Sequence, residues 1–239
     1  MPFSDRTEII YGSQSMTQLA DARVAVFGLG GVGAAAALDL ARVGVGNITV
    51  VDFDTISETN LNRLAFAFDF SIGKEKTALF AELARGINPN ITVKTITDFL
   101  HGDTVDKIDF TAFDFVIDAI DSLNPKINLI VALLATETPF ISVMGTGGRV
   151  DPTKLHISDF WETSVCSLAR SVRKRLRNRD IRNPFFAVWS DELPVAPIES
   201  KNGHDDTFTG RVRKQQGSTP FVPQTAGHFA ASFAVKNLI

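Results

Sequence analysis

The stretch "VFGLGGVG", residues 26–33, decides the fold. It places Gly28, Gly30 and Gly33 in a Gly-x-Gly-x-x-Gly turn between an apolar strand and an alanine-rich helix. Such a turn lets phosphate oxygens approach the backbone at the start of the helix, where the partial positive charge of the helix attracts them. The glycines therefore predict a nucleotide site, but they do not distinguish NAD from ATP.

Around this turn, strands alternate with helices. The apolar patterns predict strands over Arg23–Phe27, Asn47–Val51, Ile91–Ile96 and Phe113–Ile117 and from Pro139 to Val143, and helices over Val32–Val43, Lys76–Gly86 and Lys126–Ala135. This order predicts an α/β fold with a doubly wound, mainly parallel, Rossmann-like sheet and helices on both faces. In such sheets the ligand binds at the carboxyl ends of the strands.

The pattern changes after "MGTGGRVDP", which ends at Pro152. There we expect strands over Leu155–Asp159 and Phe185–Trp189, helices over Trp161–Arg177 and Phe229–Leu238, and a mobile loop from Ser200 to Ser218. We interpret residues 1–150 as a nucleotide-binding core. Residues 151–239 are then a C-terminal extension that completes the same domain.

Composition narrows the class of protein. The chain has 239 residues, of which 44% are hydrophobic and 21% charged, as in ordinary folded proteins. No apolar run approaches the roughly 20 residues that a membrane span needs, and Met1 to Glu8 carry no apolar signal-peptide core. The single Cys166 excludes an intramolecular disulfide and a multi-cysteine zinc site. A cytoplasmic protein without a membrane span is the simplest interpretation.

Charged residues near the glycine turn favour ATP over NAD. Asp52 ends the second strand, at about the spacing where a carboxylate binds a ribose hydroxyl. The same edge of the predicted sheet receives Asp54, Asn60 and Arg63 from "VDFDTISETNLNRL", Lys76 from "IGKEKT", and Asp118 and Asp121 from "VIDAID". Hydride transfer needs few charges, whereas expulsion of pyrophosphate needs cations for the leaving group and carboxylates for Mg²⁺. We predict ATP and Mg²⁺ as the ligands.

These motifs carry a family resemblance. "GLGGVG", "VDFD", "NLNR", "IGKEK" and "DAID", in this order between Arg6 and Val143, resemble the ubiquitin-activating-enzyme-like superfamily of ATP-dependent adenylating enzymes, which includes ThiF and MoeB. The resemblance implies an adenylation core that activates a carboxylate as an acyl-adenylate. It implies that Gly28, Gly30, Gly31 and Gly33 line the phosphate loop, Asp52 holds the ribose, Asn60, Arg63 and Lys76 face the phosphates, and Asp121 assists magnesium.

Two further residues take their expected roles from the same resemblance. Asp54 stands where these enzymes usually have an acid. Arg6, in "RTEIIYG", matches an arginine that often reaches the ATP of the neighbouring subunit. The resemblance therefore implies a homodimer.

The sequence also departs from the superfamily. The paired Cys-x-x-Cys zinc motifs of the sulfur-carrier activators are absent, and no cysteine follows "MGTGGRVDP" where a catalytic thiol would stand. We interpret Cys166, in a predicted helix, as a packing residue. A mechanism that passes the acyl group to a protein thiol is therefore disfavoured.

A second resemblance extends over nearly the whole chain. "VIDAIDSLNPK", "GTGGRVDPTKLHISD", "VWSDELP" and "STPFVPQTAG" resemble the tRNA threonylcarbamoyladenosine dehydratases. This subfamily implies ATP-dependent cyclisation of the modified adenosine in tRNA, in which an internal nitrogen displaces AMP and no cysteine is needed. It admits a sulfur-relay protein as a further partner. The main alternative is an enzyme that activates the C-terminus of a ubiquitin-like sulfur carrier; a nucleotide-binding adaptor and an NAD oxidoreductase rank lower.

A basic stretch offers a place for tRNA. "ARSVRKRLRNRDIR" contains four cations that we assign to tRNA phosphates, namely Arg170, Arg173, Lys174 and Arg177. At helical spacing the charges of this stretch wrap most of the way round the helix. The alternative interpretation is an exposed, solubilising helix, which is the usual role of a charge run.

Overall fold

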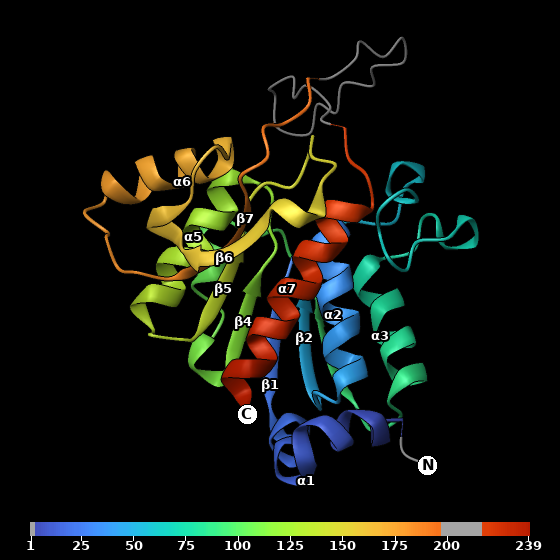
Figure 1. The fold of residues 1–239 in the computed structure, drawn as a ribbon. Coiled ribbons are helices and arrows are strands. Elements are labelled where there is room, and N and C mark those ends of the chain that lie inside the picture. Colours follow the sequence, from blue (N-terminus) through green and yellow to red (C-terminus); the bar gives the residue numbers. More distant parts are fainter. Residues whose placement is uncertain (1–2, 197–216) are drawn as a thin grey trace.

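The computed structural model describes residues 3–196 and 217–239, and its centre is one seven-stranded sheet (Figure 1). The strand order is β3-β2-β1-β4-β5-β7-β6. The strands are β1 (Arg23–Phe27), β2 (Asn47–Val51), β3 (Thr92–Ile96), β4 (Phe115–Asp118), β5 (Phe140–Val143), β6 (Leu155–Asp159) and β7 (Phe186–Ser190). Neighbours are parallel except β6 and β7, which are antiparallel. The predicted α/β, mainly parallel sheet is confirmed.

Helices cover both faces of this sheet (Figure 1). They are α1 (Asp5–Asp21), α2 (Gly31–Val43), α3 (Lys76–Ile87), α4 (Gly102–Val105), α5 (Leu123–Ala135), α6 (Ser167–Arg177) and α7 (Phe221–Leu238). The helices α2, α3 and α7 share one hydrophobic core with the sheet, and α4, α5 and α6 share the other. Figure 1 shows α1 across the amino edge of the sheet, away from the carboxyl ends of the strands.

Strand β4 shows why the sheet is apolar on both faces. Phe115 and Ile117 pack into the core under α2 and α7, whereas Val116 packs into the core under α5. Successive side chains of a strand point to opposite faces, so a parallel sheet covered on both sides reads as a continuous apolar run. By the same alternation, Asp118 at the end of β4 points to the face that α5 covers. Its contacts are described below.

The helix predicted over Trp161–Arg177 is too long, because α6 begins only at Ser167. Asp159 accepts a hydrogen bond from the Trp161 N–H and starts a short 3₁₀ turn instead. Val165 then has a φ of 60°, which no α-helix accommodates. Cys166 therefore precedes the helix, and its buried Sγ accepts a hydrogen bond from the Ala169 N–H at 3.5 Å. Its burial agrees with a packing role.

Two helices differ from the sequence prediction at the ends of the chain. The helix α7 begins at Phe221 rather than Phe229, because Pro223 lies in its first turn, where a helix needs no backbone N–H. The helix α1 was not predicted, and its exposed Ile9 and Ile10 obscure an amphipathic pattern.

Most of the loop expected from Ser200 to Ser218 lies outside the described residues. Within residues 3–196 and 217–239, no helix is both long and apolar enough to cross a membrane.

Candidate ATP and tRNA sites

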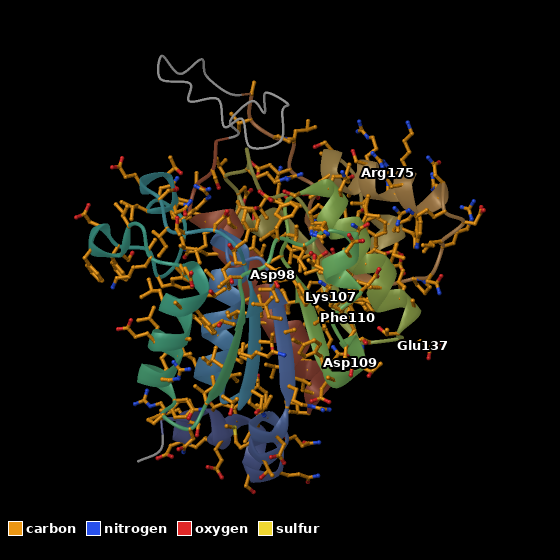
Figure 2. All side chains as sticks on the ribbon, turned by 180° about the vertical axis from the view of Figure 1, so that it is seen from behind. Asp98, Lys107, Asp109, Phe110, Glu137 and Arg175 are labelled. Carbon is orange, nitrogen blue, oxygen red and sulfur yellow. The ribbon has the colours of Figure 1, made fainter. Side chains whose placement is uncertain are left out.

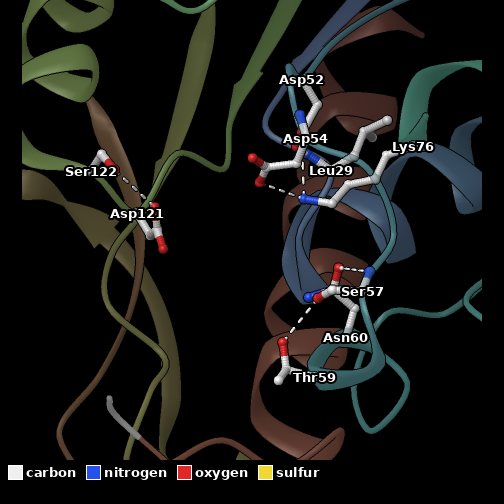
Figure 3. A network of polar contacts seen from close by, with 9 residues as sticks. All are labelled: Leu29, Asp52, Asp54, Ser57, Thr59, Asn60, Lys76, Asp121 and Ser122. Carbon is white, nitrogen blue, oxygen red and sulfur yellow. Dashed lines mark hydrogen bonds and ion pairs between the residues drawn. The ribbon is translucent and has the colours of Figure 1, made fainter. Parts of the chain in front are cut away.

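The carboxyl edge of the sheet brings together most of the predicted nucleotide ligands. The glycine turn follows β1, Asp52 follows β2, and Asp121 follows β4, which is the neighbour of β1 on the other side. Figure 3 shows Asp52, Asp54 and Lys76 as one cluster, with Asp121 on a separate loop across from them. The strand order alone places these side chains around one point, because parallel strands end at the same edge.

The glycine turn has the geometry of a phosphate loop. Gly28 has a φ of 89°, and a Cβ there would lie 2.9 Å from the carbonyl oxygen of Ala119. A Cβ on Gly33 would overlap the Gly28 carbonyl, so both positions require glycine. A Cβ on Gly30 would have no atom within 4 Å. That open side, next to the uncapped N-terminus of α2, is where an anion can approach the backbone.

Asp52 ties the end of β2 to this loop. Its Oδ2 accepts a hydrogen bond from the Leu29 N–H at 2.5 Å, and its Oδ1 accepts one from the Asp54 N–H at 2.9 Å. A carboxylate has about four lone-pair positions, so Asp52 keeps the capacity to accept a ribose hydroxyl. Asp52 thus orients the loop in addition to its predicted role.

Lys76 opens α3 and is buried among these acids. Its Nζ lies 2.8 Å from Asp54 Oδ2 and 3.4 Å from Asp52 Oδ1. The whole residue is only 5% exposed, so the surrounding atoms hold the ammonium in place. An ammonium has three N–H donors, and two of them are used here. One donor is left for a further acceptor.

Asn60 and Arg63 lie in the crossover between β2 and α3. Asn60 Oδ1 accepts a hydrogen bond from the Ser57 N–H at 3.3 Å (Figure 3). Arg63 Nη1 donates to the Thr59 carbonyl at 2.6 Å, and no carboxylate of the described residues pairs with it. Gln224 of α7 donates to the Arg63 carbonyl at 3.1 Å. The crossover is therefore anchored while the Arg63 charge stays available to an anion.

The two predicted acids at the carboxyl end of β4 differ in burial. Asp121 is exposed, and its Oδ1 accepts a hydrogen bond from Ser122 Oγ at 3.2 Å. Asp118 is fully buried, with its Oδ2 2.7 Å from Lys126 Nζ and 2.6 Å from Ser142 Oγ. The expectation that both acids serve the ligand is therefore wrong for Asp118. Sequence reasoning missed this network, although a lysine in the apolar segment "LNPKINLIVALLA" is a signal for it.

Arg6 lies apart from the other predicted ligands. It is exposed on α1. The end of this helix is bonded to the amino edge of the sheet, where the Gly46 N–H donates to the Leu19 carbonyl and the Asn47 N–H donates to the carbonyl of Ala22, the residue after α1. This is the edge opposite the glycine turn of the same chain (Figure 1). Arg6 therefore does not complete the nucleotide site of its own chain.

The basic helix α6 is amphipathic, so the prediction that its charges wrap most of the way round is wrong. Ala169, Val172 and Leu176 are buried on one side. Arg170, Lys174 and Arg177 are exposed, and Figure 2 shows the neighbouring Arg175 on the outer side of the helix. Arg170, Lys174 and Arg177 share one solvent face, and Arg175 lies further round the helix.

Arg173 is the exception among the predicted tRNA ligands. It donates to the carbonyl and the hydroxyl of Thr163, and its guanidinium lies 5.6 Å from the centroid of the Phe160 ring. Burial, together with the charges of Arg177 and Arg170, lowers the pKa of Arg173, but an arginine stays protonated at physiological pH. A pocket of about 220 Å³ is lined by Arg170, Arg173, Lys174, Arg177 and Asn178.

Comparison with known proteins identifies the family and solved structures with the same fold. The ThiF family model matches residues 5–226. The tRNA threonylcarbamoyladenosine dehydratase of Escherichia coli K12 is 38% identical over 98% of this chain and 92% of its own length. The crystal structure of that enzyme, TcdA, in complex with ATP superimposes with a TM-score of 0.86, at 33% identity, over 98% of this chain and 93% of the other.

A relative with a different activity matches less of the chain. The molybdopterin-synthase adenylyltransferase of Salmonella typhimurium is 36% identical, but over 52% of this chain and 49% of its own length. The dehydratase match thus covers nearly the whole chain, whereas the adenylyltransferase match covers about half of it. With a family model that spans residues 5–226, the chain belongs to the ThiF family.

Proposed function

We propose that the chain catalyses the ATP-dependent dehydration of threonylcarbamoyladenosine in tRNA. The observation that carries this proposal is the match to a dehydratase over 98% of the chain, against 52% for the adenylyltransferase of the other activity. The threonyl carboxylate attacks the α-phosphate of ATP and pyrophosphate leaves. A nitrogen of the same substrate then attacks the acyl-adenylate and AMP leaves. The net change in the nucleoside is the loss of one water.

This chemistry uses the cations that surround the glycine loop. Arg63 and the free donor of Lys76 stabilise the charge that develops on the phosphates as pyrophosphate leaves, and Asn60 donates to the same phosphates. The backbone at Gly30 and Gly31, at the N-terminus of α2, receives the phosphate oxygens, and Asp52 accepts from the ribose. Asp54 holds Lys76 in position.

Asp121 fits a magnesium ion that is held mainly by the nucleotide. The described residues contain no group of three or more His, Cys, Asp or Glu side chains that could enclose a metal. Magnesium in ATP sites usually takes one or two protein carboxylates and completes its shell with phosphate oxygens and water. An exposed Asp121, across from the cations, matches that donor set. The bound ion would neutralise phosphate charge.

The absence of a usable thiol fits an internal nucleophile. Cys166, the single cysteine, is 4% exposed and accepts a hydrogen bond at the start of α6. We expect Cys166→Ser to keep most of the cyclisation activity. Loss of turnover in a folded Cys166→Ser variant would favour a thioester mechanism instead.

The outer face of α6 is the proposed tRNA contact. Arg170, Lys174 and Arg177 are exposed and can bind backbone phosphates, although the Arg177 guanidinium also lies 5.7 Å from the centroid of the Trp161 ring. Arg173 lines the same pocket but mainly holds Thr163, so it supports the surface from below. The C-terminal extension that contains α6 belongs, in this proposal, to the same domain as the adenylation core. We also infer a cytoplasmic location from the tRNA substrate, and a sulfur-relay protein stays a candidate partner.

A homodimer would supply the missing Arg6. Because α1 lies at the amino edge, its Arg6 would serve the site of a second copy, and the exposed Ile9 and Ile10 of the same helix would be covered there. Mixing Arg6→Ala with Arg63→Ala tests this directly, because a mixed dimer contains one site with both arginines intact. Recovery of activity that neither variant has alone supports the dimer, and no recovery in demonstrated mixed dimers contradicts it.

The function itself is tested by mass spectrometry. We expect the protein, ATP, Mg²⁺ and tRNA that carries threonylcarbamoyladenosine to give a nucleoside lighter by one water, with AMP and pyrophosphate. The second candidate, activation of a ubiquitin-like sulfur carrier, shares the ATP site and predicts ATP–pyrophosphate exchange that depends on a small protein ending in Gly-Gly. Calorimetry with ATP and with NAD separates these two ATP-dependent functions from an NAD oxidoreductase. Tight NAD binding without ATP binding would exclude both ATP-dependent functions.

A further inference from the structure

A buried polar network lies at the end of β4, next to the proposed ATP site. It does not contact the open side of the glycine turn at Gly30. It consists of Asp118, Lys126 and Ser142, all with fully buried side chains. Asp118 pairs in the sheet with Phe27 on one side and with Ser142 on the other. A buried ion pair is costly to form and is seldom kept for stability alone. The location of this pair at the carboxyl end of β4 points to a role in holding the loop that follows the strand.

The segment that carries Asp121 is held at both ends, and the Lys126 side chain holds the first of them. At the first end, its Nζ donates to Asp118 Oδ2 at 2.7 Å, while Asp118 Oδ1 accepts from the Ile120 N–H at 3.1 Å. At the other end, the backbone N–H of Lys126 donates to the Ser122 carbonyl at 3.1 Å. This second bond belongs to the backbone of α5 and would be made by any residue but proline at position 126. Asp121 therefore lies between two anchors, of which only the one at Asp118 depends on the Lys126 side chain.

The same segment is packed against the glycine loop. The Ala119 N–H donates to the Phe27 carbonyl at 2.8 Å. A Cβ on Gly28 would lie 2.9 Å from the Ala119 carbonyl, and one on Gly33 would lie 3.2 Å from Ala119 Cβ. The two loops are therefore closely packed against each other at Ala119. A change at Lys126 that lets residues 118–122 relax would therefore move Asp121 relative to the phosphates.

We propose that Lys126, through Asp118 and Ser142, is a positioning residue that fixes the Asp121 carboxylate for the divalent metal of bound ATP. This inference rests on the proposed role of Asp121. It predicts an effect on the metal affinity of the protein–ATP complex that exceeds any effect on ATP binding itself, because the glycine loop and Asp52 have their own contacts.

The test uses Mn²⁺ as the probe, with free Mn²⁺ measured by electron paramagnetic resonance in the presence of protein and ATP but without tRNA. Lys126→Met alone leaves a buried, unpaired Asp118, and that variant could fail to fold. The variant Asp118→Leu with Lys126→Met replaces the pair by apolar side chains, which proteins often tolerate well. Ser142→Ala is a milder variant that removes one donor to Asp118.

For the folded double variant we expect the Mn²⁺ midpoint to rise by about tenfold or more, as for other residues that orient a metal ligand from behind. Calorimetry should show ATP binding without metal that changes by less than about twofold. Ser142→Ala should raise the Mn²⁺ midpoint in the same direction by a smaller factor. Arg23→Ala with Asp114→Ala removes an ion pair at the other end of β4 and should leave the midpoint unchanged.

Asp121→Asn separates this inference from the proposal on which it rests. If Asp121→Asn raises the midpoint but the Lys126 and Ser142 variants do not, positioning by Lys126 is overturned and the metal role of Asp121 stands. If Asp121→Asn has no effect, both are overturned.

Discussion

An ion pair between a basic side chain and an aspartate lies at each end of strand β4, and the two pairs differ in their exposure to solvent. At the amino edge, Arg23 Nη2 lies 2.9 Å from Asp114 Oδ1, with side chains 55% and 37% exposed. At the carboxyl edge, Lys126 Nζ lies 2.7 Å from Asp118 Oδ2, with both side chains fully buried. Water screens the first pair and not the second. Loss of one partner should therefore cost little stability at the amino edge and much more at the carboxyl edge.

The difference in burial between the two pairs matches the part of the structure that each pair holds. At the amino edge, Asp114 also accepts a hydrogen bond from the Arg23 N–H at 2.8 Å, so this pair only joins two strand ends. At the carboxyl edge, the buried pair sets the path of a loop that reaches the proposed ATP site. Changes at the two edges should consequently affect different properties.

The largest expected effect is on rate and belongs to the carboxyl edge. Arg63→Ala should reduce the single-turnover rate at saturating tRNA by about a hundredfold or more, because a preorganised cation for the leaving phosphates is lost. Its affinity for tRNA should stay nearly the same. Arg23→Ala, an arginine at the amino edge, is the matched control and should keep the rate. Equal rates for the two variants would remove the distinction between the edges.

The next effect is on stability and compares the two pairs directly. Lys126→Met should lower the free energy of unfolding by about 3–5 kcal/mol, because it leaves a buried carboxylate without its cation. Arg23→Ala should lower it by only a small fraction of that amount, since the pair is exposed. Urea unfolding with a constant m-value measures both. A loss for Arg23→Ala as large as that for Lys126→Met would contradict the contrast in burial.

The third effect is on tRNA binding and extends the comparison to surface cations. Arg170→Ala with Lys174→Ala should lower the slope of log affinity against log salt by about two, since each lost phosphate contact lowers it by about one. Arg85→Ala with Lys94→Ala removes two exposed cations from α3 and β3 and should leave the slope unchanged. Binding measured across a salt series decides this. Equal losses from both double variants would mean that α6 has no special part in docking.

The smallest effect concerns pH at the amino edge. The side-chain hydrogen bond from Arg23 holds the pKa of Asp114 below its ordinary value of 3.8. A carboxyl whose pKa is lowered by folding contributes stability above its unfolded pKa, and this contribution is lost as the pH falls through its folded pKa. The difference in urea midpoint between the wild type and Arg23→Ala should thus be present at neutral pH and shrink below about pH 4. A difference that stays constant down to pH 3 would assign it to packing of the Arg23 side chain rather than to charge.

The sequence was enough to predict the sheet and the gathering of charged side chains at its carboxyl edge, because both depend on local patterns. Alternating apolar runs and turn glycines defined β1 and β2 to the residue. The end of β2 located Asp52, and the start of the next helix located Lys76, at the same edge. The start of α6 was missed because it depends on the Asp159 side chain and on the positive φ of Val165. The burial of Asp118 was missed for a different reason: its partners come from α5 and β5, and only the fold brings them together.

The contact between α2 and α7 has a consequence for the order in which the protein can be made. Gly227 of α7 packs so closely on α2 that a Cβ there would overlap the Val32 carbonyl, and Gln224 holds the Arg63 carbonyl. During synthesis, α7 leaves the ribosome after every other described element. The apolar side of α2 that faces α7 therefore stays uncovered until residues 221–238 have emerged. We expect nascent chains that stop before Phe221 to be unable to bind ATP, so nucleotide binding would report that translation has passed that point.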